Sequence, residues 1–329
     1  MIEKIIRNTL EKWGYWEIKV PILGDLSLWE GDNIVKIIDR KGRICALRPE
    51  ITSLVIQNIN CDNIPTRIYY MGPIFTVDNG EIIENFQIGW ELISIQDEWR
   101  DIEGLLIIFD VLSKLNIKEF IIEINSTEIW DYIWKDLDGE KIDRCKKYLI
   151  KKDYVNLIRE ISLEKENIVK DVKNFIFYPN RDIENLELKN LIEKLHNFKK
   201  KLEKIGIEKD KIVISPMLFR PFDYYKGLIF QVYLRELKTP LGGGGSYIQY
   251  NKKGEKIYGI GFAFVEEKLS SILKNIEDNE KVFIGDKEKY IEYYEILREE
   301  REKCNKVVFI PYIENLEIEK LKGEIIFLT

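Results

Sequence analysis

Hydrophobic and polar residues alternate most clearly in the segment Thr66–Ser94, where two stretches, TRIYYMGPIFTVD and EIIENFQIGWELI, flank Asn79-Gly80. A period of two predicts β-strands, and Asn-Gly is a preferred dipeptide in the tight turn between paired strands. The sequence therefore predicts a β-hairpin over this segment.

The second strand of this hairpin has two unlike faces. One face is apolar and carries Phe86, Ile88, Trp90 and Leu92. The other carries an amide, a residue without a side chain and a carboxylate: Gln87, Gly89 and Glu91. Such a face suits the floor of a small polar pocket, because the glycine leaves room for a ligand whose polar groups the neighbours bind. It equally suits the solvated face of an antiparallel sheet, and this strand alone leaves both interpretations open.

Periodicity divides the rest of the chain into three parts. Residues 1–125 and 207–275 mix amphipathic helices with strands and predict one core, in which residues 15–23 form a strand. Residues 126–206 are charged, poor in glycine and helical in period, which predicts a helical insertion. Residues 276–329 alternate strand, helix, strand, short helix and strand, and predict a small αβ tail.

Composition excludes several classes of protein. The 329 residues are 45% hydrophobic, enough for a large core, and the net charge of −6 provides no overall field that would attract nucleic acid. The N-terminal stretch is charged rather than a signal peptide, and no apolar run reaches the ~18–20 residues of a membrane span, so we expect a cytoplasmic location without membrane contact. One histidine and four scattered cysteines, Cys61 among them, give no support for a metal site or a disulfide framework.

Two further segments carry candidate binding residues. In LFRPFDYYKG, Arg220 and Asp223 precede Tyr224 and Tyr225, a set that can hold a carboxylate and stack a heteroaromatic ring. An aromatic corner of the core with a structural ion pair is an equal alternative. In ALRPEIT, Glu50 suits the first turn of a helix, where the helix dipole favours an acid.

A run of four glycines, Gly242–Gly245, precedes a predicted strand. Neither Lys-Ser/Thr nor a helix follows this run, so it matches neither a phosphate-binding loop nor a dinucleotide fingerprint. A hairpin with a flexible turn is the plain alternative.

These segments together resemble the motifs of class II aminoacyl-tRNA synthetases, in the form found in histidyl-tRNA synthetases. GYWEIKVPIL is similar to motif 1, the hairpin to motif 2 with its Y-x-G-P-x-F and F-x-Q-x-G-x-E strands, and GIGFAFVEEKL to motif 3. ALRPEIT and LFRPFDYYKG resemble the histidyl signatures L-R-P-E-x-T and L-V-R-G-L-D-Y-Y-T-G. The resemblance covers nearly the whole chain. It implies an α+β fold: a class II synthetase-like antiparallel sheet flanked by helices, with a helical insertion and a shortened anticodon-domain-like tail, assembled as a homodimer.

The resemblance also implies which residues would bind an amino acid. In the family the glutamate of L-R-P-E-x-T contacts the substrate amino group, the arginine of the histidyl signature assists activation, and its tyrosines close on the imidazole. The implied histidine-like pocket comprises Glu50, Thr52, Gln87, Glu91, Arg220, Tyr224, Tyr225, Gly244 and Gly245.

Three positions depart from the ATP-binding pattern of the family. Thr76 replaces the arginine that clamps the α-phosphate, Ser246 replaces the arginine of G-G-R-Y-D, and Lys268 replaces the arginine that grips the γ-phosphate. Pro221 and Phe222 also replace a glycine and a leucine. Because loss of one such donor typically costs about 2.7–4 kcal/mol of transition-state stabilisation, efficient adenylation is not expected.

An amino-acid pocket without these clamps resembles the histidyl-tRNA synthetase-like regulatory subunit of ATP phosphoribosyltransferase. That resemblance implies no catalytic residues and no cofactor. It implies the short catalytic subunit of the transferase as a partner, which this chain would activate, and free histidine as a feedback ligand; tRNA binding is not expected. Two alternatives stay open: a divergent amino-acid-activating ligase of the histidyl-tRNA synthetase type, and a stand-alone amino-acid sensor.

Overall fold

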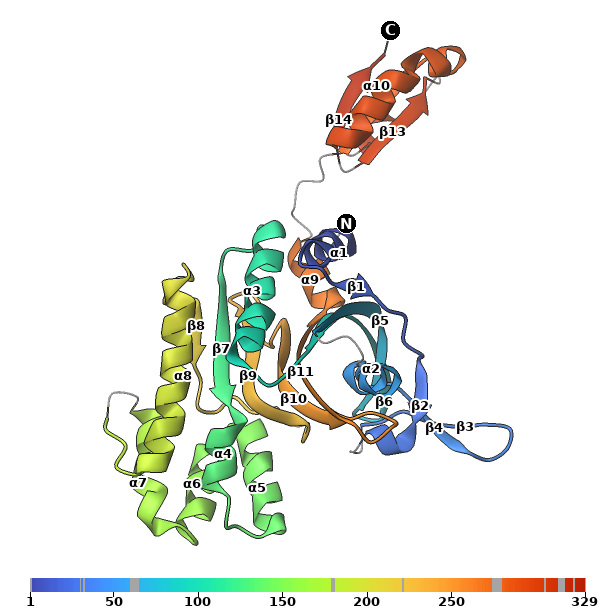
Figure 1. Ribbon diagram of the computed structural model, residues 1–329. Coiled ribbons are helices and arrows are strands. Elements are labelled where there is room, and N and C mark those ends of the chain that lie inside the picture. Colours follow the sequence, from blue (N-terminus) through green and yellow to red (C-terminus); the bar gives the residue numbers. More distant parts are fainter. Residues whose placement is uncertain are drawn as a thin grey trace. The chain divides into compact units, whose positions relative to one another are not determined.

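The computed structural model describes residues 2–328 apart from positions 30, 32, 60–64, 179–180, 221, 274–279, 305, 313–316 and 322, so Cys61 and Pro221 lie outside the described residues. The chain forms two compact units, Ile2–Ser270 and residues 271–329 (Figure 1).

A mixed sheet of eight strands is the centre of the larger unit. In spatial order the strands are β1 (Trp16–Glu17), β5 (Thr66–Asp78), β6 (Glu81–Ile93), β11 (Lys256–Val265), β10 (Gly242–Tyr250), β9 (Tyr225–Leu234), β7 (Phe120–Ser126) and β8 (Ile212–Ile214). The predicted α+β class is confirmed. The sheet differs from a purely antiparallel one at its two ends, where β1 pairs with β5 and β7 with β8 in parallel. Each parallel pair is joined by a long crossover segment, as parallel strands require.

The predicted hairpin is confirmed, because β5 and β6 pair in register along their whole length. Asn79 and Gly80 form the turn with φ of 49° and 84°, the left-handed values that a two-residue hairpin turn of this type needs. The apolar face of β6 is part of the core: Trp90 packs against Phe262 of β11 with ring centroids 5.0 Å apart.

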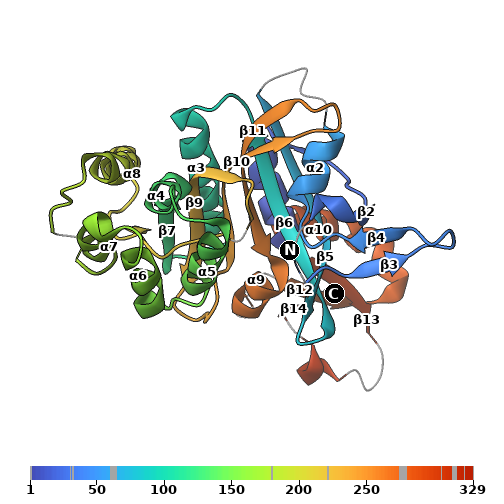
Figure 2. The ribbon, with the colours of Figure 1, turned by 90° about the horizontal axis from the view of Figure 1, so that it is seen from below.

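The two faces of the sheet are covered by different helices. Figure 2 shows α2 (Thr52–Asn58) and α3 (Glu98–Lys114) on opposite sides of β10 and β11. A Cβ on Gly104 of α3 would lie 2.9 Å from the Ile260 side chain of β11, so this helix packs closely on the sheet. We call the side that carries α2 the pocket face and the side that carries α3 the helix face.

The crossover between β7 and β8 is helical. Its helices are α4 (Thr127–Ile133), α5 (Gly139–Ile150), α6 (Tyr154–Ser162), α7 (Glu166–Phe177) and α8 (Leu186–Lys204). Four of them begin at a side chain that accepts a hydrogen bond from the first turn, which stabilises the helix end: Ser126, Asp138, Asp153 and Asn185. These caps add to the helical period of the sequence and explain why so charged a stretch folds as helices.

The strand that the sequence predicts over residues 15–23 is largely absent: only Trp16–Glu17 pair in the main sheet, and only Leu23 belongs to a second, smaller sheet. After β1 the chain leaves the main sheet and forms a separate antiparallel sheet of β2 (Leu23–Asp25), β4 (Ile44–Leu47) and β3 (Lys36–Ile38). The larger unit also contains α1 (Ile2–Lys12) and a short 3-10 helix, η1 (Leu26–Leu28), and α9 (Glu266–Ile272) follows β11.

Arg48 gives the physical reason for this difference. Its Nη1 donates to the carbonyls of Val20 and Pro21 at 2.7 and 3.0 Å, and its Nε donates to the carbonyl of Pro73 in β5 at 2.8 Å. A guanidinium group therefore satisfies backbone acceptors that a neighbouring strand would otherwise take.

The smaller unit is a parallel sheet with one helix. Its elements are β12 (Glu280–Gly285), η3 (Lys287–Lys289), α10 (Tyr290–Lys303), β13 (Lys306–Pro311), η4 (Ile318–Lys320) and β14 (Glu324–Phe327). The strands lie in the order β13-β12-β14, and Phe283, Tyr293 and Leu297 form the core between sheet and helix. The predicted order of elements is confirmed, with a 3-10 turn as the short helix.

Candidate functional site

A cavity of about 200 Å³ lies on the pocket face of the central sheet. Most residues of the implied amino-acid pocket line it: Glu50, Thr52, Gln87, Glu91, Arg220, Tyr224, Tyr225 and Gly245. They come from four separate segments, which the sheet and α2 bring together. Gly244 does not line this cavity; a Cβ there would lie 1.9 Å from the Gly261 carbonyl oxygen, so its role is close packing of β10 on β11.

Glu91 is fully buried at the centre of this cavity. Its Oε1 accepts hydrogen bonds from the hydroxyls of Thr52 (2.7 Å) and Tyr70 (3.1 Å). Its Oε2 and the Tyr247 hydroxyl, which faces the same carboxyl group, have no hydrogen-bond partner of normal geometry among the described residues. Burial raises the pKa of Glu91 to about 8, and the surrounding hydroxyls only partly offset this effect.

Glu50 lies in the same cavity, but its carboxylate is already engaged. Oε1 accepts from Trp29 Nε1 at 2.6 Å, and the Ser53 backbone N–H donates to both oxygens at 3.1 Å. Burial raises its pKa as well. Glu50 thus accepts a hydrogen bond from the first turn of α2, as its predicted position near a helix start implies. Of the two carboxyl groups, Glu91 is the one with an oxygen that accepts no hydrogen bond from a described residue.

Two other polar atoms in the cavity wall lack partners. Gln87 Oε1 and Arg220 Nε are buried, and neither forms a hydrogen bond with a described residue. The Arg220 guanidinium lies over the Tyr225 ring at 5.3 Å, and a Cβ on Gly243 would lie 2.1 Å from its Nη1. The glycine thus leaves the space that this guanidinium occupies.

Aromatic rings form the wall next to Arg220. Tyr224 stacks on Phe222 with centroids 5.3 Å apart and an interplanar angle of 15°, and it meets Tyr225 at 4.7 Å. Asp223 points elsewhere: it pairs with Lys146 of α5 at 2.7 Å and is exposed. The alternative of an Arg220–Asp223 ion pair is therefore not realised.

The three positions that depart from the ATP-binding pattern lie in different places. Lys268 lines the cavity and donates to the Pro240 carbonyl at 2.7 Å. Thr76 is on the same face of β5 as Tyr70 but nearer the hairpin turn, opposite Ile83, and does not line the cavity.

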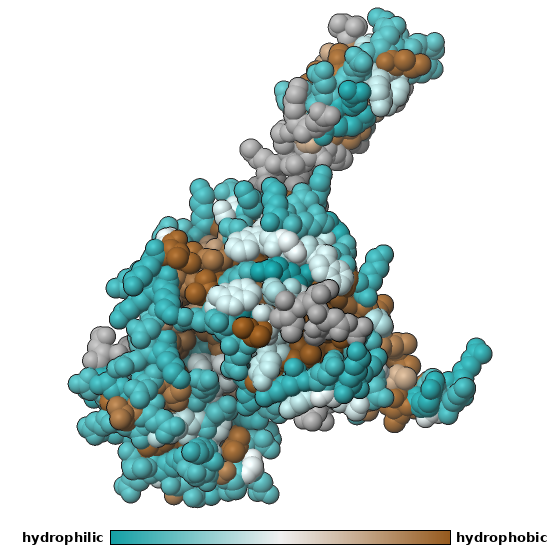
Figure 3. Space-filling view, in the orientation of Figure 1, coloured by the Kyte–Doolittle hydropathy of each residue, from teal (hydrophilic) through white to brown (hydrophobic). Residues whose placement is uncertain are grey.

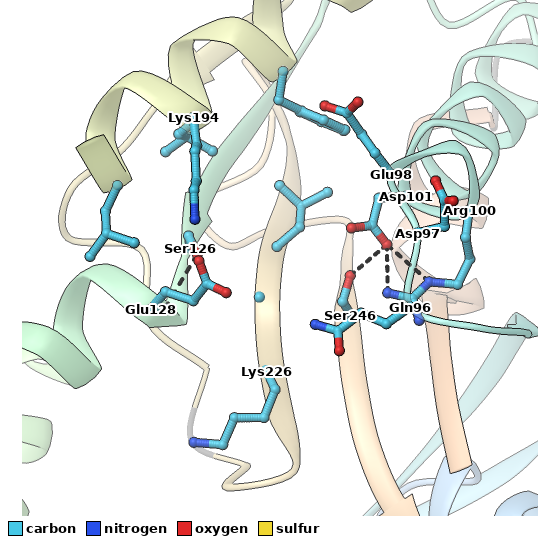
Figure 4. A pocket seen from close by; sticks show the side chains of 15 residues that line it. Gln96, Asp97, Glu98, Arg100, Asp101, Ser126, Glu128, Lys194, Lys226 and Ser246 are labelled. Atoms are coloured by element: carbon cyan, nitrogen blue, oxygen red, sulfur yellow. Dashed lines mark hydrogen bonds and ion pairs between the residues drawn. The ribbon is translucent and has the colours of Figure 1, made fainter. Parts of the chain in front are cut away.

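Ser246 lies on the helix face, because residues of β10 alternate sides and Tyr247 takes the pocket face. Its hydroxyl donates to Asp101 of α3 at 2.8 Å (Figure 4). Ser246 therefore does not line the amino-acid cavity.

Sequence reasoning missed several residues of this site. Tyr70 and Tyr247 supply hydroxyls to the Glu91 carboxyl group, and Trp29 holds Glu50. For Tyr70 the signal was present, since it faces Gly89 across the hairpin, two residues from Glu91. No local pattern marks Trp29, because its contact joins segments that only the fold brings together.

The described residues contain no group of three or more histidine, cysteine, aspartate or glutamate side chains that could hold a metal ion. Within the same residues, none of the helices has both the length and the apolar character needed to cross a membrane. The polar groups of the cavity wall are acceptors at Glu91 and Gln87 and a cationic donor at Arg220.

The family model for histidyl-tRNA synthetase matches residues 1–269. The chain belongs to this family. The match includes the central sheet, the helical crossover and every residue of the cavity described above.

Relatives with two different names have similar sequence identity to this chain. A histidine–tRNA ligase from Saccharolobus solfataricus is 26% identical over 85% of this chain and 73% of its own length. An ATP phosphoribosyltransferase regulatory subunit from Bacillus cereus is 27% identical over 90% of this chain and 76% of its own length. Identity alone does not separate a ligase from a regulatory subunit here.

The solved structures confirm the fold. A Bacillus halodurans protein, titled as an ATP phosphoribosyltransferase regulatory subunit/histidyl-tRNA synthetase, superposes with a TM-score of 0.76 at 20% identity. The superposition covers all of this chain and 93% of that one. The chain therefore has the class II synthetase-like fold that its motifs imply.

Proposed function

We propose that this chain is a non-catalytic regulatory subunit that activates the short catalytic subunit of ATP phosphoribosyltransferase and takes part in feedback by histidine. The observation that carries the proposal is a group of three buried polar atoms in one cavity that have no hydrogen-bond partner among the described residues: Glu91 Oε2, Gln87 Oε1 and Arg220 Nε. Each such buried atom costs free energy unless a ligand supplies its hydrogen bond.

Histidine has the groups that these atoms need. Its ammonium and imidazole N–H groups can donate to Glu91 and Gln87, and its carboxylate can accept from the Arg220 guanidinium. The ring can lie against Tyr224 and Tyr225, which border the cavity next to Arg220. In this assignment Glu50 and Thr52 shape the acceptor end, and Gly245 leaves room beside Tyr225.

The ATP-binding half of the family site is not rebuilt in this chain. Thr76 carries no charge, and Lys268, which lines the cavity together with Arg220, donates to the backbone carbonyl of Pro240. Adenylation develops charge on phosphate oxygens that cationic groups must stabilise. These features support the proposal that the chain binds an amino acid without activating it. We therefore propose neither catalytic residues nor a cofactor.

We also propose that the chain forms a homodimer through the region of the small sheet. Leu23 is 52% exposed, and Ile38 and Ile44 are 70% and 53% exposed. Figure 3 shows apolar surface at the base of the β3–β4 hairpin, on the right of the view. Exposed apolar side chains gathered on one surface favour a protein partner.

The remaining expectations are part of the same proposal. The chain would have three domains: a core made of residues 1–125 and 207–275, a helical insertion of residues 126–206, and an αβ tail of residues 276–329. The protein would be cytoplasmic and have no role at a membrane. The net charge of −6 does not favour tRNA as a partner.

A transferase assay tests the proposal. The rate of ATP phosphoribosyl transfer by the short catalytic subunit would be measured alone and with this chain added. We expect a large rise in rate and a complex on size-exclusion chromatography. An unchanged rate without a complex would refute the regulatory assignment; histidine binding alone would then point to a stand-alone sensor.

A second candidate is a divergent amino-acid-activating ligase, which the relative named histidine–tRNA ligase favours. Such an enzyme would catalyse histidine-dependent exchange of pyrophosphate into ATP. We expect no exchange above background. Exchange that Glu91→Gln abolishes would establish the ligase instead.

A further inference from the structure

A second cavity, of about 240 Å³, lies on the helix face of the central sheet (Figure 4). One wall belongs to the start of α3 and to β10 and contains Gln96, Arg100, Asp101 and Ser246; the other belongs to α4 and α8 and contains Ser126, Glu128 and Lys194. Its apolar lining comes mainly from Leu191, Leu195 and Phe198 of α8 and from Leu228 of β9. The cavity thus lies where the helical crossover meets the sheet, and it shares no lining residue with the cavity on the pocket face.

Asp101 is held in one orientation by three donors on one of its oxygens. Arg100 Nε and Nη2 donate to Oδ1 at 3.1 and 2.8 Å, and Ser246 Oγ donates to it at 2.8 Å. The other oxygen, Oδ2, points away from these donors into the cavity (Figure 4), and no described residue forms a hydrogen bond with it. A fixed carboxylate oxygen is therefore presented to whatever occupies the cavity.

Arg100 is the second sign that this wall is incomplete. Its side chain is only 3% exposed, it lines the cavity, and its Nη1 has no hydrogen-bond partner among the described residues. A buried guanidinium donor without a partner is unusual in a folded protein. The pair thus joins a buried arginine to a half-buried aspartate, and each side chain keeps one polar atom without a hydrogen bond to a described residue.

The opposite wall offers a cation. Lys194 extends from α8 into the cavity toward Ser126 (Figure 4), and its ammonium group makes no ion pair or hydrogen bond with a described residue. Lys226 lies lower in the same view and pairs with Asp131 at 3.2 Å. On the same wall, Leu191, Leu195 and Phe198 of α8 form an apolar strip.

We propose that this cavity binds a small zwitterion with an apolar side chain, of the size of an amino acid. Asp101 Oδ2 accepts from its ammonium group, Lys194 pairs with its carboxylate, and the α8 strip packs on its side chain. The inference stands on the helix face alone and does not rest on the proposed regulatory function. Because its walls belong to the sheet and to the helical crossover, occupancy would link these two parts of the larger unit.

Calorimetric titration of the full chain with L-leucine tests this site. Two truncated ligands separate the contributions of the ammonium and carboxylate groups to binding. 4-Methylpentanoate lacks the ammonium group, and 3-methylbutylamine lacks the carboxylate. Because a charged hydrogen bond contributes about 1.5–3 kcal/mol, we expect each truncation to weaken binding by about tenfold or more.

Variants assign the binding to this cavity. Lys194→Met should weaken L-leucine binding about tenfold, whereas Lys200→Met, an exposed lysine on the same helix outside the cavity, should leave it unchanged. Asp101→Asn keeps an acceptor for Arg100 and Ser246 but presents an amide in place of Oδ2, and should weaken binding similarly; circular dichroism checks that it folds. Failure of L-leucine to bind at millimolar concentration would overturn the proposal. So would binding that Glu91→Gln abolishes and Lys194→Met leaves intact, because the ligand would then occupy the pocket face.

Discussion

Glu91, which is buried, and Asp101, which is half-buried, are carboxyl groups on opposite faces of one sheet, and their surroundings differ in the cations they provide. On the helix face, Arg100 donates two hydrogen bonds to Asp101. On the pocket face, the described residues offer Glu91 hydroxyl groups: Thr52 and Tyr70 donate to it, and the Tyr247 hydroxyl faces the same carboxyl group. Burial raises the pKa of both groups, but Arg100 counteracts the effect at Asp101, and hydroxyls are what counteract it at Glu91.

The two carboxyl groups therefore differ in where their cation comes from. Arg100 supplies one to Asp101 Oδ1, while Oδ2 stays available in the cavity on the helix face; among the described residues, no cation donates a hydrogen bond to Glu91. A buried charge needs a partner, or the group takes up a proton instead. Asp101 has its partner in the chain, so its charge pair contributes to structure even when the adjoining cavity is empty. Glu91 lacks one, so a ligand that brings a cationic or N–H group would complete it.

Breaking the Arg100–Asp101 ion pair on the helix face should have the largest effect on stability. Arg100→Met removes a buried guanidinium and leaves the half-buried Asp101 without its cation. We expect the free energy of unfolding to fall by about 3 kcal/mol, as measured by urea denaturation at neutral pH. The loss should shrink as Asp101 becomes protonated at acidic pH. Arg100→Met with Asp101→Leu should recover most of it, and a single variant within about 1 kcal/mol of wild type would show that the pair is not structural.

Replacing the carboxyl group on the pocket face should weaken binding and stabilise the empty protein. Glu91→Gln keeps the acceptor for Thr52 and Tyr70 but removes the ionisable oxygen, so histidine affinity should fall about 100-fold by calorimetry.

The stability effect of the same variant depends on pH. The Glu91 pKa of about 8 in the folded chain lies above its ordinary value of 4.5. Its contribution to the unfolding free energy is therefore fully present below pH 4.5 and is lost as the pH rises towards 8. Glu91→Gln lacks this loss, so its advantage over wild type should grow between pH 5 and pH 8, to roughly 1–3 kcal/mol. An advantage that does not change with pH would contradict the assignment of a raised pKa.

Removing one hydroxyl donor should have a smaller effect. Thr52→Val preserves shape but deletes the 2.7 Å hydrogen bond to Glu91 Oε1. We expect a loss of about 1 kcal/mol in histidine binding, and a further rise in the pKa of Glu91, because this hydrogen bond favours the ionised form. Thr52→Ser, which keeps the hydroxyl, is the matched control.

The smallest effect should come from Lys268, the lysine that lines the same cavity. Its ammonium group donates to the Pro240 carbonyl rather than to Glu91. Lys268→Met should therefore change histidine affinity by no more than about twofold and leave the pH dependence of stability unaltered. A steeper pH dependence in this variant would show that Lys268 partly neutralises Glu91.

The sequence predicts the pocket face better than the helix face, for a physical reason. Alternation within β6 places Gln87, Gly89 and Glu91 together, because strand geometry fixes which residues share a side. The same rule places Ser246 opposite Tyr247, but a run of glycines gives no apolar pattern from which to read the side. Contacts such as Trp29 with Glu50 or Ser246 with Asp101 depend on tertiary packing, and no local period encodes them.

The division of residues 15–23 illustrates the same limit. The alternation there is genuine, yet β1 stops at Glu17, and further along the segment the carbonyls of Val20 and Pro21 accept from Arg48 rather than from a neighbouring strand. The class of the fold was predictable because motifs in order along the chain carry it. Individual strand ends were not, because a single side chain from elsewhere in the fold decides them.

The most direct test is a histidine titration of the transferase complex formed by the short catalytic subunit and this chain, with the rate normalised to that of the same complex without histidine. With the wild-type chain, we expect histidine to suppress the rate; with Glu91→Gln, the half-suppressing concentration should rise about 100-fold. Suppression at the same concentration with both chains would contradict the account, because histidine would then act at a site other than the cavity that contains Glu91.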